Sequence, residues 1–81
     1  MTNPDDPAAL FLRVVGKRIR LVRLTRELTQ AELADAAGIS RSFLSLIEHG
    51  AHGIDVVRLF RLAAALDMPL TDLLTDESNR R

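Results

Sequence analysis

Eighty-one residues with 47% apolar content are enough for one domain with one hydrophobic core. The absence of cysteine excludes disulfide bonds and thiolate metal sites, and the formal net charge of zero argues against a strongly basic nucleic-acid binder. No apolar run approaches the length of a membrane-spanning helix, and the acidic start lacks the basic region of a signal peptide, so we expect a cytoplasmic protein without a membrane partner.

The charges are unevenly distributed along the chain. Residues 13–26 contain no acidic residue and six basic ones: Arg13, Lys17, Arg18, Arg20, Arg23 and Arg26. Acidic residues gather towards the two ends, at Asp5, Asp6, Asp67, Asp72, Asp76 and Glu77. A neutral chain with this distribution can still present one basic face to phosphates, with lower non-specific affinity than a strongly basic protein.

The first predicted helix runs from Asp6, a favourable N-cap that precedes a proline, to about Arg26. Its inward stripe consists of Leu12, Val15, Ile19 and Val22. Gly16 lies inside the helix and marks either a close packing contact or the junction with an N-terminal extension. Four further apolar residues lie partly off the stripe: Leu10, Phe11, Val14 and Leu21. They indicate either a broad buried face or an added dimerisation surface.

The second and third predicted helices are short and have clear starts. Thr29 and Glu32 form a capping box, Gln30 is the first residue of the second helix, and Gly38 ends it. Ser40 caps the third helix, which ends near Gly50. Phe43, Leu44 and Ile47 share one side of this helix; Ser42, Ser45 and His49 face away; Arg41 and Leu46 lie on the flanks.

Two further helices complete the prediction. Asp55 caps the fourth, and its expected inward stripe consists of Val56, Leu59, Phe60, Ala63 and Leu66. A short fifth helix carries Leu70, Leu73 and Leu74. We therefore expect an all-α, compact five-helix domain at residues 9–75, after an extension at 1–8 and before a polar tail at 76–81.

Two short helices joined by a glycine turn form a helix-turn-helix, here at residues 30–49. A small residue, Ala34, precedes the turn glycine by four positions, and the inward positions are apolar: Leu33, Ala37, Ile39, Leu44 and Ile47. The stretch LTQAELADAAGISRSFLSLIEHG resembles the Cro and lambda-repressor type of helix-turn-helix, the XRE family. The resemblance extends from GKRIRLVR at residue 16 to about residue 74. It implies a lambda-repressor-like, DNA-binding transcriptional regulator, either a repressor or a restriction–modification controller.

The resemblance also implies roles for individual residues. Thr29 and Gln30 match the positions that hold a DNA phosphate at a helix N-terminus. The positions that enter the major groove are matched by Ser40, Arg41, Ser42, Ser45 and Leu46, and His49 matches a position near the backbone. Arg41 suits bidentate contact with guanine, or a phosphate contact without sequence preference. Family pattern further implies a partly buried ion pair between Arg23 and Glu48.

Three departures from the family pattern affect these expectations. Leu46 stands where a polar or basic residue is common, so it either contacts a thymine methyl group or avoids the groove. Glu27 stands where a glycine is usual after the first helix, which predicts a different turn geometry. The loop after the third helix reads Ala51-His52-Gly53-Ile54 and lacks the usual basic residues, which weakens the case for phosphate contacts from it.

No catalytic constellation is evident, so we predict that the protein is not an enzyme and needs no cofactor or small-molecule ligand. His49, His52 and Asp55 are close in sequence, but chance explains them better than a metal site. We expect a homodimer on duplex DNA that binds an inverted repeat, with Leu70, Leu73 and Leu74 at the interface, aided by Leu10 and Phe11. The alternative function is an antitoxin-like protein-interaction module whose DNA binding is autoregulatory.

Overall fold

The computed structural model describes residues 6–75, so the predicted tail at 76–81 and the first five residues of the extension lie outside the described part. The helices in chain order are α1 (Pro7–Thr25), α2 (Gln30–Ala37), α3 (Arg41–Glu48), α4 (Val56–Ala65) and α5 (Leu70–Leu74). Within residues 6–75 the chain forms helices and turns but no strand, which confirms the all-α, five-helix prediction.

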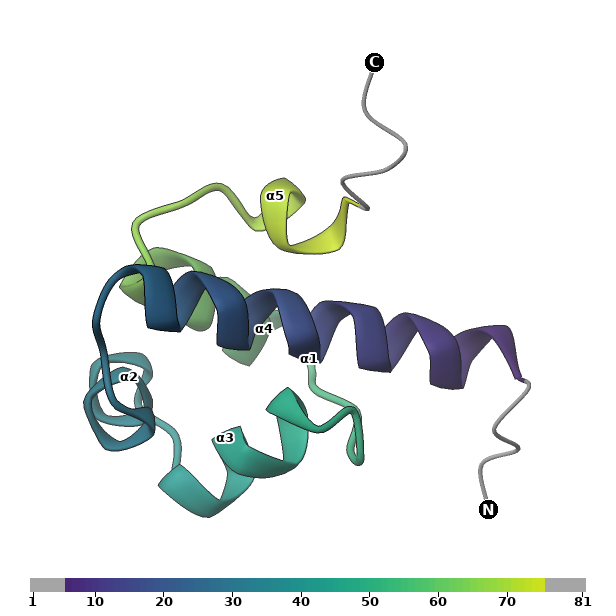
Figure 1. The fold of residues 1–81 in the computed structure, drawn as a ribbon, viewed down its shortest axis with the longest axis horizontal. Helices are drawn as coiled ribbons and strands as arrows, with labels where there is room; N and C mark the ends of the chain where they lie inside the picture. Colours follow the sequence, from purple (N-terminus) through teal and green to yellow (C-terminus); the bar gives the residue numbers. More distant parts are fainter. Residues whose placement is uncertain (1–5, 76–81) are drawn as a thin grey trace.

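The helices pack around one apolar core. Figure 1 shows α1 lying across the bundle, with α2 and α3 on one side of it, α5 on the other and α4 behind. Contacts join α1 to α3 and α5, and α4 to α2 and α5. The largest fully buried side chains are Ile19, Leu33, Leu44, Leu62, Leu66 and Leu73. Every helix contributes to this set, so the core depends on all five. None of the helices in residues 6–75 is both long enough and apolar enough to cross a membrane.

Side-chain N-caps begin four of the five helices, as the sequence predicts: Asp6, Thr29, Ser40 and Asp55. The predicted capping box is complete, because the Thr29 hydroxyl accepts from the Glu32 N–H at 3.0 Å and the Glu32 carboxylate accepts from the Thr29 N–H at 2.8 Å. The bond from the Thr29 N–H lowers the pKa of Glu32. A backbone bond from Arg58 likewise lowers the pKa of Asp55. These local bonds fix where each of these four helices starts.

A left-handed residue follows each of the first four helices: Glu27, Gly38, Gly50 and Asp67. Gly38 ends α2 with φ 71°, as predicted. Glu27 follows α1 with φ 59°, which is the conformation that a glycine favours. The prediction of a different turn geometry is therefore wrong. The chain keeps the left-handed turn, and the side chain of Glu27 costs about 1 kcal/mol there relative to glycine.

The predicted inward stripe of α4 is partly wrong. Val56 is 68% exposed and Phe60 is 60% exposed, while Leu62, absent from the predicted stripe, is fully buried. The buried positions Leu59, Leu62, Ala63 and Leu66 follow helical spacing. Successive residues of a helix are turned by about 100°. Because Leu59 faces the core, the next residue, Phe60, points away from it.

The predicted dimer surface on α5 also needs correction. Leu73 is fully buried and Leu70 is half-buried against the core. Only Leu74 remains exposed, at 39%. Leu73 therefore stabilises the monomer and is not available to a second subunit. Leu10 and Phe11, the other predicted contributors, are exposed near the start of α1.

Gly16 marks a close approach of α3 to α1. A Cβ atom added at Gly16 would lie 2.2 Å from the carbonyl oxygen of Ile47 and 3.0 Å from that of Glu48. Both atoms belong to the backbone, so relief would require the whole end of α3 to move. Of the two interpretations that the sequence allows, the structure supports the packing contact.

We predict that Gly16→Ala destabilises the protein even though alanine is the better helix former. The clash with α3 should cost about 1–3 kcal/mol, which exceeds the gain of about 1 kcal/mol in helix propensity. Urea denaturation measures the difference. The matched control is Gly53→Ala, because a Cβ atom at Gly53 meets nothing within 4 Å. Equal or greater stability of Gly16→Ala would show that α3 adjusts at no cost.

Candidate nucleic-acid interface

The third helix has one side in the core and one side in solvent. Leu44 and Ile47 are buried and Phe43 is half-buried. The exposed residues are Arg41, Ser42, Leu46 and His49, and Ser45 is half-buried. The division predicted from the helical wheel is therefore confirmed. It leaves a short outward surface that is largely polar and carries one guanidinium group.

A buried ion pair fixes this helix against α1. The Nε atom of Arg23 donates to Oε2 of Glu48 at 2.7 Å, and its Nη2 atom donates to Oε1 at 3.1 Å. The two side chains are only 9% and 1% exposed. Arg23 also donates to the carbonyl of Leu28 at 2.8 Å. The predicted pair is confirmed, and its two-pronged geometry offsets the cost of removing both charges from water.

The same carboxylate holds Gln30, a contact that sequence reasoning missed. The side-chain amide of Gln30 donates to Oε1 of Glu48 at 3.0 Å. Gln30 is the first residue of α2 and Glu48 the last of α3. The two positions are 18 residues apart, and no local signal links them. The bond orients the residue expected to hold a phosphate relative to the helix expected to read bases.

Five of the eight predicted DNA-binding residues surround one open hollow: Gln30, Arg41, Ser42, Ser45 and Leu46. The other three, Thr29, Ser40 and His49, do not line it, and their polar groups make local bonds. The hydroxyl of Thr29 belongs to the capping box, and that of Ser40 accepts from the N–H of Phe43 at 3.0 Å. The Nδ1 atom of His49, the C-cap of α3, lies 2.7 Å from the carbonyl oxygen of Ser45. His49 is exposed and does not line the hollow, and its predicted position near the DNA backbone stays a prediction.

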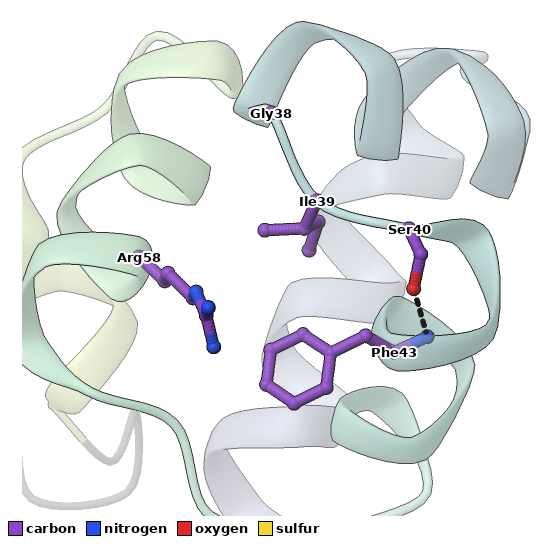
Figure 2. A pocket seen from close by; sticks show the side chains of 5 residues that line it. All are labelled: Gly38, Ile39, Ser40, Phe43 and Arg58. Carbon is purple, nitrogen blue, oxygen red and sulfur yellow. Dashed lines mark hydrogen bonds between the residues drawn. The ribbon is translucent and has the colours of Figure 1, made fainter.

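A second hollow lies on the opposite flank of α3, lined by Gly38, Ile39, Ser40, Phe43 and Arg58. Figure 2 shows Arg58 of α4 reaching into this hollow towards the ring of Phe43. Its guanidinium carbon lies 5.3 Å from the ring centroid, and its Nε atom lies 3.5 Å from Asp55. Phe43 also meets His52 edge to face, with ring centroids 5.3 Å apart.

Sequence reasoning missed Arg58 because it treated the fourth helix only as part of the core. The single signal was the i,i+3 spacing from Asp55. The contacts with Phe43 and Asp55 hold a cation beside α3. The loop after α3, which lacks basic residues at 51–54, therefore has a basic residue nearby.

Comparison with known proteins agrees with this geometry. The helix-turn-helix family model HTH_3 matches residues 19–73, which include α2, α3 and the turn between them. The chain belongs to this family, the XRE-type helix-turn-helix proteins. The family consists of DNA-binding transcriptional regulators and not of enzymes, as the sequence predicts.

Three proteins that are similar to this chain illustrate the match. The immunity repressor protein of Bacillus phage phi105 is 36% identical over 64 residues, which are 79% of this chain but 44% of that protein. The chain thus spans less than half of that relative. The restriction-modification controller C.AhdI from Aeromonas hydrophila superposes with a TM-score of 0.75 and 34% identity, over 76% of this chain and 94% of that one. SinR of Bacillus subtilis, solved in complex with DNA, gives a TM-score of 0.72 and 32% identity, over 75% and 98% of the two chains.

We predict that Glu48→Ala lowers the free energy of unfolding by about 3–5 kcal/mol, because it leaves Arg23 charged and buried without its partner. Urea denaturation or a thermal melt measures the loss. Asp35→Ala serves as the matched control, since Asp35 is an exposed acidic residue of α2, and its stability should stay close to that of the parent. If Glu48→Ala melted with the parent, the pair would be unimportant for the fold.

Proposed function

We propose that this protein binds duplex DNA with sequence preference and regulates transcription, as a repressor or a restriction–modification controller. One observation carries the proposal. The inner side of α3 is locked to α1 by the buried Arg23–Glu48 pair, while its outer side presents an exposed polar surface beside Gln30. Support comes from three similar proteins: a phage immunity repressor, a restriction-modification controller, and a regulator whose structure was solved in complex with DNA. Such a role suits a cytoplasmic location.

In this proposal α3 enters the major groove, which is wide enough for one helix. Arg41 is the base-reading residue, because a guanidinium group can bond guanine O6 and N7 together. Ser42 and Ser45 bond a base edge or a phosphate, and Leu46 contacts a thymine methyl group. At the start of α2, Thr29 and Gln30 accompany free backbone N–H groups that favour a phosphate. Ser40 and His49 lie at the edges of the groove.

We further propose that the protein binds as a homodimer to an inverted repeat. One copy of α3 covers only a few base pairs, and a dimer reads two half-sites about 34 Å apart on one face of DNA. Because Leu73 is buried, the exposed apolar residues Phe60 and Leu74 take its place as interface candidates. A hollow between the α4 end and α5, lined in part by Phe60, Met68 and Leu70, offers a complementary surface. Sedimentation showing a monomer at high micromolar concentration would count against the dimer.

Selection of bound sequences from a random DNA pool tests the function directly. We expect enrichment of an inverted repeat, and we expect Arg41→Ala to relax the preference at one base position in each half-site. Arg61→Ala is the matched control, since Arg61 is an exposed arginine of α4 outside the lining of both hollows beside α3. A uniform loss across all sequences would reassign Arg41 to a phosphate. Failure to enrich any sequence, at low as well as moderate salt, would refute DNA binding.

Arg58 should contact a phosphate on the flank of α3 opposite Gln30, because a helix in the major groove has a backbone on each side. We predict that Arg58→Ala weakens specific and non-specific binding alike. The slope of log K against log salt should fall in magnitude by about 0.9 per bound subunit, the value for one lost phosphate contact. Fluorescence anisotropy over a salt series measures it, again with Arg61→Ala as control. An unchanged slope would remove Arg58 from the interface.

A further inference from the structure

The side of α1 that points away from the core carries a second apolar stripe. This outer stripe consists of Leu10, Val14, Lys17, Leu21 and Leu24. Its spacing alternates between four and three residues, which is the heptad spacing of a helix that packs along another helix. The four apolar members are 46%, 44%, 50% and 46% exposed, and Lys17 is exposed as well.

The outer stripe is separate from the surface that holds the bundle together. The same helix buries Val15, Ile19 and Arg23 against the rest of the protein, so α1 is apolar on two sides and uses only one. In Figure 1 the start of α1, in purple, extends beyond the other helices. The family model begins at residue 19, so Leu10, Val14 and Lys17 precede the shared segment. A row of half-exposed apolar side chains marks an interaction surface.

The charges along α1 indicate what could cover this stripe. Arg13 and Arg20 are exposed on one flank, Lys17 lies within the stripe, and no acidic residue occurs in Pro7–Thr25. Residues at such flanking positions determine partner choice in helix pairs through opposite charges. A helix that packs here therefore needs carboxylates facing these three cations.

A second copy of the same helix fits poorly. In an antiparallel pair centred on Lys17, that residue meets its own copy, and Arg13 of each copy comes within one residue of the position that faces Arg20. In a parallel pair Lys17 again meets itself. Like charges placed directly opposite each other are destabilising, and α1 has no acidic residue to compensate. A lipid surface also fits less well, because Lys17 interrupts the apolar row at its centre, where a facing helix can supply a glutamate.

We propose that the outer stripe of α1 docks one amphipathic helix of a partner protein, with apolar residues at heptad spacing and acidic residues on its flanks. One carboxylate of that helix pairs with Lys17, and others lie beside Arg13 and Arg20. The docking surface is distinct from the hollows on either side of α3, so the proposal does not depend on DNA binding.

A synthetic helix serves as the probe. It spans about three heptads, with leucine at the stripe positions, glutamate on the flanks and one glutamate set opposite Lys17. Fluorescence anisotropy with the full chain should show binding that weakens as salt increases. A peptide with lysine in place of every glutamate is the matched control and should not bind. Val14→Ser and Leu21→Ser should each weaken binding at least tenfold, whereas Val57→Ser should leave it unchanged, because Val57 is also an exposed valine but lies on α4.

A charge exchange tests the register. Lys17→Glu should weaken binding of the acidic peptide at least tenfold, and a peptide with lysine opposite position 17 should restore it. Circular dichroism melts confirm that these exposed variants remain folded. The proposal is overturned by absence of peptide binding, by equal binding of the lysine peptide, or by failure of the exchange to restore affinity. Self-association or binding to phosphatidylserine vesicles that requires Val14 and Leu21 would also overturn it, by assigning the stripe to a second copy or to a membrane.

Discussion

The carboxylate of Glu48 is the point at which three helices meet. It accepts two bonds from Arg23 of α1 and one from Gln30 of α2, and it stands at the last residue of α3. Arg23 adds a bond to the carbonyl of Leu28 in the connection after α1. A buried charge is tolerated only when its bonding capacity is satisfied. Sliding or rotating α3 would break several of these bonds together, so the network determines where the helix lies.

Gly16 makes that network possible. It lies seven residues before Arg23, about two helical turns along the same side of α1. Without a side chain there, the carbonyl oxygens of Ile47 and Glu48 approach the backbone of α1 closely. Steric contact and ion pairing therefore act on the same end of α3. Its outward residues contribute little to the core, which leaves their chemistry free to serve recognition.

The charge distribution explains how a chain with no net charge can have two basic surfaces, one around α3 and one along α1. Cations lie along α1 and beside α3, at Arg41 and Arg58, whereas formal charges sum to zero over the whole sequence. At physiological salt the range of electrostatic forces is about 8 Å. A binding partner therefore responds to the charges near its contact surface more than to the net charge of the protein. Around α3 the cations lie beside polar side chains, which suits the contacts with phosphates and bases that we propose. Along α1 they lie beside exposed leucines, which suits the acidic helix that we propose as a partner.

The sequence by itself determined where the capped helices start, that α2 ends at a glycine, and which side of α3 faces the core. These features depend only on residues within one or two helical turns of each other. The resemblance to a known family supplied the Arg23–Glu48 pair. Only the tertiary structure decided that Phe60 points outward, that Leu73 belongs to the core, and that Glu27 keeps a left-handed turn. It also joined Gln30 to Glu48 and placed Arg58 beside Phe43. Burial and bonding at these positions depend on neighbours from distant parts of the chain, whose placement the pattern of apolar residues does not fix.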